Sequence, residues 1–375
     1  MQQTKHSNSI RFEDREFLVE TWYDSEELDV VTQITENGHI LDTYKLRVNE
    51  NTTEEETQSL TEETHKNISV DWELLFYMYK KVKGSNHVQS LNKLGLVFEI
   101  RNLLTEAIDC FQDALSIDED YIEANINLGN VYTKAGLFDQ AIELFNKTIE
   151  KTPNYPDLHY SLGVAYLKKE DFINSINSLE RAIEINPSYD IAHFMLSKVY
   201  LSSMNGEQHT SDMIPSPLRQ KKILAHLQKA VDLNPTFDQF EIRKTIEEIQ
   251  NGNFEEAIQL VEEIDFLNQD QQSNHFDEEF YIRFMFGGKG KDVQLLSDYI
   301  DVLKEKIEEN PGFPDLRNNL GVAYLIQCRN IFLKAMDQFR TALKINPSYV
   351  VAKKNLKLAE NEGKGFIILL RALLK

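Results

Sequence analysis

The stretch from Ile122 to Tyr155 reads IEANINLGNVYTKAGLFDQAIELFNKTIEKTPNY and is the clearest copy of a unit that recurs along the chain. With Ile122 as position 1, Leu128 and Gly129 occupy positions 7 and 8, and Pro153 occupies position 32. Apolar residues at helical spacing on both sides of Gly136 predict two helices joined by a turn at that glycine. The proline ends the second helix and precedes the next unit.

The landmarks of this unit return at a nearly constant spacing along the chain. Each unit has a leucine followed by glycine or serine in its first half, and a proline near its end. The leucines are Leu94, Leu128, Leu162, Leu196 and Leu320, and the prolines are Pro153, Pro187, Pro235, Pro311 and Pro347. Counted in residue numbers, the intervals between successive prolines are 34, 48, 76 and 36. The second interval shows that one unit carries an insertion of about 14 residues, and the third that a further, degenerate unit lies between Pro235 and Pro311.

This pattern resembles the tetratricopeptide repeat (TPR) family, whose repeat is a pair of packed helices. The residues that carry the resemblance are Leu128, Gly129, Tyr132, Ala141, Phe145 and Pro153 in the best unit, and Leu320, Gly321, Tyr324, Ala335, Phe339, Ala342 and Pro347 in a late unit. The resemblance covers residues 88–360 and implies a mainly α fold, an α-α superhelix with a concave groove. The glycine at position 8 has no β-carbon, so the second helix can approach the first closely.

The N-terminal residues do not follow the repeat. Three runs rich in β-branched and aromatic residues predict a small β meander within residues 1–50, docked on another part of the chain. The runs are Phe17 to Tyr23, Leu28 to Thr35 and Ile40 to Val48, with a hairpin turn at Glu36-Asn37-Gly38-His39. The acidic, Thr-rich residues 51–70 predict a flexible linker, and residues 71–87 predict a connecting helix.

Two other segments interrupt or follow the repeat array, which spans 88–360. The insertion at 202–218 is polar, contains two prolines and predicts a mobile loop, either simply tolerated or used for regulation or binding. Residues 361–375 predict a helix that caps the apolar face of the last repeat. Because this end is basic and apolar, a weak contact of 366–375 with a membrane surface or a partner is the alternative.

The composition disfavours several classes of protein. The chain has 40 Lys and Arg against 61 Asp and Glu, a net charge of −21 that argues against nucleic acid as a partner. Two cysteines are too few for a disulfide framework and favour a reducing cytoplasm. We expect neither a secretory signal nor an integral membrane segment, because no apolar run is long enough.

The sequence offers few groups for catalysis. It has no HExxH or CxxC motif, and the glycine-rich segment 287–292 lacks the spacing and the hydroxyl residue of a phosphate-binding loop. His159 and His193 both occupy position 4, which favours packing roles over a metal site, and Cys110 stands alone on a helix. We therefore expect no catalysis, no cofactor and no metal. The alternative is an enzyme, or a subunit of an enzyme complex, whose activity depends on the N-terminal module.

Some TPR proteins bind the C-terminal carboxylate of heat-shock chaperones through a two-carboxylate clamp. The corresponding positions of this chain hold Asn92, Leu96, Asn127, Asp157 and Ser161. Only Asn127 matches the clamp, and its three basic residues are missing. The sequence therefore argues against that ligand.

The resemblance also assigns positions 2, 5, 6, 9, 12 and 13 of each first helix to the groove. Asparagines there can bind an extended peptide backbone, and apolar residues can hold apolar side chains. The candidate groove residues are Asn127, Asn130, Tyr160, Val164, Ile191, Phe194, Met195, Asn318 and Asn319. We expect the rings of Tyr160 and Phe194, both at position 5, to project side by side as an apolar hot spot with Met195.

These features predict a cytoplasmic adaptor that binds a protein or peptide segment in its groove. Two alternatives remain open. Another part of the chain, such as Asp71 to Lys83 or the insertion, could fill the groove. The chain could also self-associate into a structural scaffold.

Overall fold

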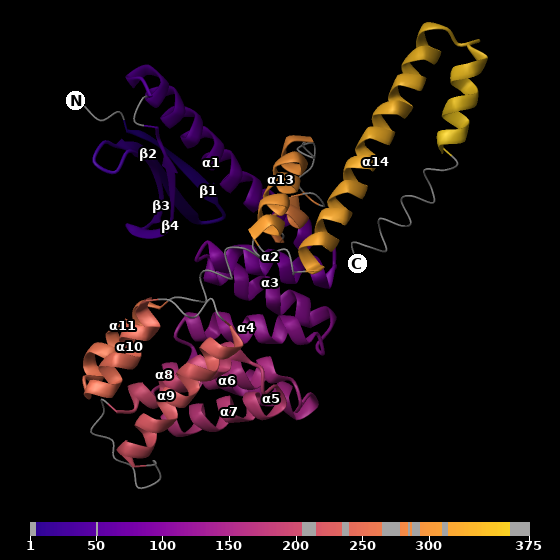
Figure 1. Cartoon of the computed structure of the whole chain (residues 1–375). Helices are drawn as coiled ribbons and strands as arrows, with labels where there is room; N and C mark the ends of the chain where they lie inside the picture. Colours follow the sequence, from indigo (N-terminus) through magenta and orange to yellow (C-terminus); the bar gives the residue numbers. More distant parts are fainter. Residues whose placement is uncertain are drawn as a thin grey trace. The chain divides into compact units, whose positions relative to one another are not determined.

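The computed structural model describes residues 5–49, 52–204, 215–234, 240–264, 278–283, 286, 293–309 and 314–360. It is mainly helical, with a small antiparallel sheet at the N-terminus (Figure 1), as the sequence predicts. Two compact units are present, Met1–Glu278 and Glu279–Lys375. Among the described residues, no helix combines the length and the hydropathy needed to cross a membrane.

The sheet is a meander of four strands rather than the three predicted. The strands pair in the order β1-β2-β3-β4 and are β1 (His6–Phe12), β2 (Arg15–Asp24), β3 (Asp29–Glu36) and β4 (His39–Arg47). The missed strand is β1, in which Ile10 and Phe12 are buried while Ser9 and Arg11 are exposed. Its outward residues are polar, so its strand pattern is weak in the sequence. The predicted hairpin turn is present, with positive φ at Asn37 and Gly38.

The prediction of a flexible linker over 51–70 is wrong for residues 54–70. They form the first half of α1 (Glu54–Lys83), which continues through the predicted connecting helix. The helix begins with a capping box, in which Thr53 and Glu56 bind each other's backbone N–H groups. The acidic residues that suggested a linker lie in the first turn, where they interact favourably with the helix dipole.

The sheet docks on α1 through aromatic side chains, which confirms that it is not an isolated hairpin. The rings of Phe12 and Phe76 stack with centroids 4.3 Å apart, and Phe17 stacks on Phe76 at 5.1 Å. Trp72 is fully buried, and its indole N–H donates to the Tyr44 hydroxyl at 3.2 Å. One face of the sheet is thus covered by α1.

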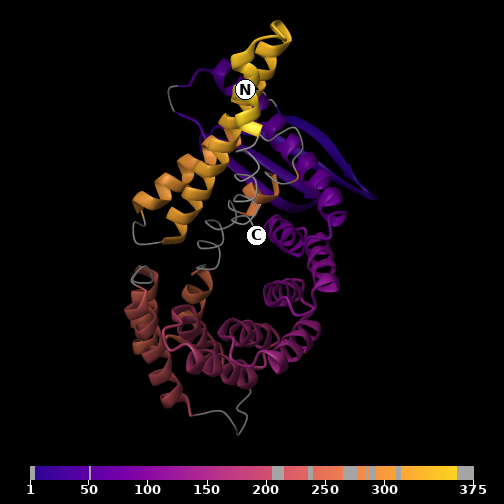
Figure 2. The same cartoon turned by 90° about the vertical axis from the view of Figure 1, so that its right-hand side faces the viewer.

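Four helix pairs follow α1 in the order that the repeat predicts. They are α2 (Val88–Ile100) with α3 (Leu104–Ile117), α4 (Ile122–Lys134) with α5 (Phe138–Lys151), α6 (Pro156–Lys168) with α7 (Phe172–Ile185), and α8 (Asp190–Ser202) with α9 (Ser216–Leu233). Figure 2 shows these helices following one another in a curve. Of the insertion, residues 205–214 lie outside the described residues, so the prediction of a mobile loop there stays a prediction.

The glycines at position 8 lie where two helices touch. A β-carbon on Gly95, Gly129 or Gly163 would lie 2.5, 2.3 or 2.7 Å from the nearest atom of the second helix. That atom belongs to Phe111, Phe145 or Leu179, respectively. No real β-carbon tolerates such distances, so the phase assigned to these three repeats is correct.

The degenerate unit forms a fifth helix pair, α10 (Phe240–Asn251) and α11 (Phe254–Glu263). Gly252 has a φ of 84° and forms the turn between the two helices. This pair departs from the regular stacking of the earlier ones, because α11, the second helix, lies against α8.

The second unit contains α13 (Val293–Glu309), α14 (Pro314–Ile345) and a helix over 350–360. The predicted helix pair of the late repeat is wrong here, because α14 is one uninterrupted helix of 32 residues. Its middle carries neither glycine nor proline, the strongest local signals for a turn. The glycine-rich segment 287–292 and the predicted capping helix 361–375 lie outside the described residues.

Candidate peptide-binding groove

The first helices of the repeats form one continuous inner strip. In order, α2 contacts α4, α4 contacts α6, and α6 contacts α8. Seven of the nine predicted groove residues lie on this strip, with Asn127 and Asn130 on α4, Tyr160 and Val164 on α6, and Ile191, Phe194 and Met195 on α8. The other two, Asn318 and Asn319, belong to α14 in the second unit.

The α2–α4 part of the strip presents side-chain amides. Asn127 donates from Nδ2 to Oδ1 of Asn92, the residue at position 5 of the preceding repeat, at 3.0 Å. Asn130 lies one turn further along α4, is half-buried, and makes no side-chain hydrogen bond to a described residue. Asn92 is buried and holds Asn127 in place, so the two half-buried amides of Asn127 and Asn130 are the ones with donors and acceptors left for a ligand.

Further along the strip, Tyr160 belongs to a tyrosine pair that the sequence did not indicate. Its ring lies 5.5 Å from that of Tyr189, and the Tyr189 hydroxyl donates to Asp157 Oδ1 at 2.6 Å. The hydroxyl oxygen of Tyr160 is buried and makes no hydrogen bond to a described residue. Burial raises the pKa of Tyr160 and of Tyr189, so both hydroxyls stay protonated at neutral pH.

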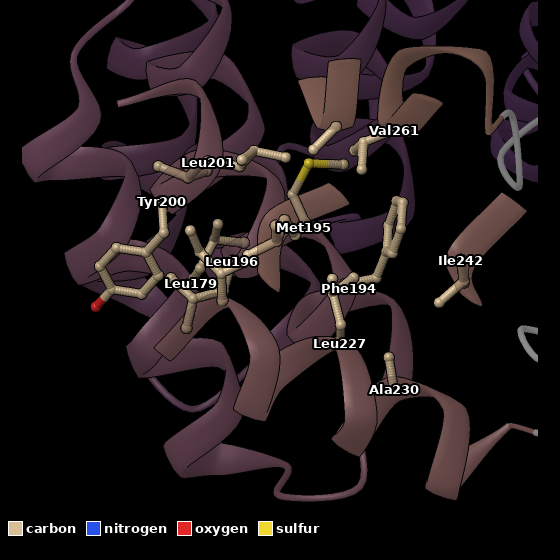
Figure 3. Packing of buried hydrophobic residues seen from close by; sticks show 14 residues of the cluster. Leu179, Phe194, Met195, Leu196, Tyr200, Leu201, Leu227, Ala230, Ile242 and Val261 are labelled. Carbon is tan, nitrogen blue, oxygen red and sulfur yellow. The ribbon is translucent and has the colours of Figure 1, made fainter. Parts of the chain in front are cut away.

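The prediction of an exposed hot spot at Phe194 and Met195 is wrong. These side chains are 4% and 7% exposed and belong to the core that α8 forms with α9, α10 and α11. Figure 3 shows Met195 beside Val261 of α11, and Phe194 facing Ile242 of α10. Tyr160 and Val164 pack against the edge of the same core.

The chain thus covers the apolar end of its own groove. The covering segment among the described residues is the pair α10–α11, which the sequence did not suggest as a candidate. The degenerate unit between Pro235 and Pro311 indicated helices in this region, but nothing in the sequence shows that α11 packs on α8. Tyr189 could have been noticed too, since it is the aromatic residue two positions after Pro187.

The two histidines at position 4 have packing roles, as predicted. His159 Nε2 lies 2.9 Å from the carbonyl oxygen of Pro153, and His193 Nε2 lies 3.3 Å from that of Pro187. Each ring therefore ties the start of its helix to the proline turn before it. His193 also contacts His226 of α9, with 2.9 Å between the two Nδ1 atoms.

Profiles of known families match this part of the chain. The family described as "TPR repeat" matches residues 95–136 and 129–170, and the family described as "Tetratricopeptide repeat" matches residues 156–189. The matched residues include all three glycines that pack against a second helix. Residues 95–189 therefore contain tetratricopeptide repeats, and the presence of such repeats supports a general role in protein interaction. No curated protein sequence matches the chain.

Solved TPR structures resemble parts of the chain. MamA is 22% identical with a TM-score of 0.34, over 44% of this chain and 91% of that one. TTC0263, a thermophilic TPR protein of Thermus thermophilus, is 21% identical with a TM-score of 0.36, over 64% and 100%. YrrB, described as a TPR protein with an unusual peptide-binding site, is 16% identical with a TM-score of 0.32, over 60% and 91%. At these values the likenesses carry no argument about the ligand of this chain.

Proposed function

We propose that this protein is a cytoplasmic, non-catalytic adaptor that binds an extended protein segment along the inner faces of α2, α4 and α6. The observation that carries the proposal is the pair of half-buried amides of Asn127 and Asn130 on α4, the first of which is held by the buried Asn92. Amide side chains donate and accept, so they match the alternating N–H and C=O groups of an extended backbone.

The position of α10–α11 determines how much of the groove a ligand can use. Because these helices bury Phe194 and Met195, the bound segment would not reach apolar anchors on α8. It would end near Tyr160, whose buried hydroxyl lacks a partner among the described residues.

The charges along the strip favour a ligand that is recognised through its backbone. Exposed Glu123 and Lys134 lie on α4, and half-buried Asp157 lies on α6. Neither sign predominates, and Lys134 donates to the backbone carbonyl of Glu99 at 3.0 Å. A strongly acidic tail would find no cluster of cations here, in agreement with the missing clamp residues.

The cysteines support the proposed compartment. Cys110 is buried, Cys328 is exposed, and both are free thiols. Burial raises the pKa of the Cys110 thiol well above its usual value, so this group is a poor nucleophile. An exposed free thiol such as Cys328 is typical of proteins in a reducing cytoplasm.

A test starts from peptides selected for binding to the full chain from a displayed random library. Hydrogen exchange of the chain with and without such a peptide then locates the site. We expect slower exchange in α4 and α6 and no change in α5, whose exposed face lies away from the groove. Protection confined to residues 5–49 or 314–360 would contradict the proposal and assign binding to another region.

A further inference from the structure

The repeats α2–α3, α4–α5 and α6–α7 close in the same way. In each repeat, a residue with positive φ lies seven residues after the position-8 glycine. The residue whose side chain covers that glycine lies nine residues further along the chain. The turn residues are Asn102, Gly136 and Glu170, and the covering side chains are those of Phe111, Phe145 and Leu179. The turn reverses the chain, and the glycine then receives the covering side chain.

The second unit contains the same components within α14. Asn330 lies nine residues after Gly321, and Phe339 lies nine residues after Asn330. Asparagine is among the residues that most readily adopt positive φ. Ala335 and Ala342 follow Asn330 at the spacings that Ala107 and Ala114 have from the turn in α2–α3. Residues 331–345 therefore have the composition of a second helix made to pack on a glycine-bearing first helix.

Within one chain these components do not meet. Because α14 stays helical through Asn330, Gly321 and Phe339 are separated by about 27 Å along the helix axis. No described atom lies within 4 Å of the place a β-carbon on Gly321 would occupy. Tyr324 is 45% exposed, whereas Phe98, its counterpart in α2, is fully buried.

The described part of this unit also exposes an unusual number of apolar side chains. Several large apolar residues on α14 and on the helix after it are exposed to solvent. Those at least 38% exposed are Tyr324, Ile331, Leu333, Ile345, Tyr349, Val350, Val351 and Leu358. An apolar surface of this extent indicates a contact with another protein surface.

We propose that a second copy of this chain provides that contact, through an exchange of helices between two α14 elements. Residues 331–345 of each copy pack as the second helix on residues 314–329 of the other copy. The register supports a symmetric pair, because Asn330 lies midway between Gly321 and Phe339. An antiparallel pair of α14 helices with Gly321 facing the Phe339 of the other copy therefore has Asn330 at its two-fold axis, and the contact occurs twice.

A second copy is favoured as the partner because residues 331–345 are complementary to the surface around Gly321. The aromatic ring and the two alanines needed to cover Gly321 are present, and the unbroken helix holds them away from their own glycine. Exchange of identical elements through an opened turn is a common route to a homodimer. The tail 361–375 and a hairpin closed within one chain are the competing occupants, and the following experiments separate them.

The first experiment measures the mass of the full chain in solution by light scattering over a range of concentrations. We expect a dimer that dissociates on dilution. Gly321→Leu should weaken it at least tenfold, because the new side chain occupies the place of the Phe339 ring, while helicity stays unchanged. Thr341→Leu, on the side of α14 away from Phe339, is the matched control and should dimerise normally.

A second experiment joins the two positions chemically. The double variant Gly321→Cys, Phe339→Cys is made in a Cys328→Ser background and treated with a short bismaleimide, whose reach is far below the separation of the two positions along one helix. Links between chains are expected. A wild-type chain that stays monomeric, links within one chain, or a Gly321→Leu variant that dimerises like wild type would each overturn the proposal. Loss of the dimer only on removal of 361–375 would overturn it as well.

Discussion

The ring of Phe145 in α5 lies over Gly129 in α4, with its Cζ atom 2.3 Å from the position of an added β-carbon. This relationship joins the two helices of the repeat, and its counterparts at Gly95 and Gly163 do the same. The contact also explains why the repeat can be recognised in the sequence, since both partners are needed at a fixed spacing.

Gly129→Ala is expected to destabilise the protein. Alanine is a better helix former by about 1 kcal/mol, but the overpacking against Phe145 should cost about 1–3 kcal/mol and prevail, because the ring is fully buried. Urea unfolding followed by circular dichroism measures the difference. Gly136→Asn is the control, because its turn has a φ of 78° with open space around it. Equal midpoints for Gly129→Ala and wild type would mean that the two helices do not pack as described.

Phe194 and Tyr160 should respond oppositely to truncation. Phe194→Ala removes a buried ring from the core under α11 and should lower the free energy of unfolding by about 3–5 kcal/mol. Tyr160→Phe removes a hydroxyl without a described partner and should leave stability unchanged or slightly higher. If Phe194→Ala were as stable as wild type, α11 would not cover α8 and the apolar end of the groove would be open.

The contact between His193 and His226 predicts a loss of stability in acid. Burial is the main cause that lowers the pKa of His226, to about 4, and His193 lowers it further. As the pH falls, His226 is protonated near pH 6.5 in the unfolded chain but only near pH 4 in the folded chain. The free energy of unfolding therefore decreases as the pH is lowered from about 6.5 to about 4. We expect a loss of up to about 2 kcal/mol, allowing for partial exposure of the ring.

Urea unfolding at pH 7, 5.5 and 4 measures this effect, with His226→Phe as the comparison. The variant cannot take up the proton at this position, so it should lose less stability than wild type on acidification. Parallel losses in the two proteins would show that His226 is not responsible.

The capping box at the start of α1 should be detectable by mutation. Thr53→Ala removes the side chain that accepts from the Glu56 N–H, and about 1 kcal/mol of stability should be lost. The backbone and then the side chain of Thr53 hold the pKa of Glu56 below its usual value. The ionised Glu56 carboxylate therefore stabilises the fold at pH values above its usual pKa. This stabilisation is lost as the pH falls through the lower pKa that Glu56 has in the folded chain. Thr52→Ala, outside the box, is the control; an equal effect of both changes would contradict this role.

The parts of the fold that the sequence predicts are those in which both partners of a contact belong to one repeat. Gly129 and Phe145 occupy positions 8 and 24 of the same repeat, so a single unit contains the whole contact. The burial of Phe194 by α10–α11 joins different units, and no spacing rule relates its residues. For this reason the sequence wrongly predicted that the apolar half of the candidate site is exposed. The amide half, Asn127 and Asn130, is half-buried on α4 and is not covered in this way.

Two other differences have local causes. The first residues of α1 are acidic in composition, as a linker is, and only the cap at Thr53 and the dipole at the helix start distinguish the two. In α14 the repeat motif is complete, but Asn330 can take either a helical or a turn conformation. The motif residues alone do not determine which of these occurs.

The most direct test of the proposed groove is the affinity of the full chain for a selected peptide, measured by calorimetry. Asn127→Ala combined with Asn130→Ala removes two amides from the inner strip, and Asn146→Ala on the exposed face of α5 is the matched control. At about 1 kcal/mol for each hydrogen bond, we predict that the double variant binds roughly 30-fold more weakly while the control binds like wild type. Equal affinity of the double variant and wild type, with both folded, would contradict the account.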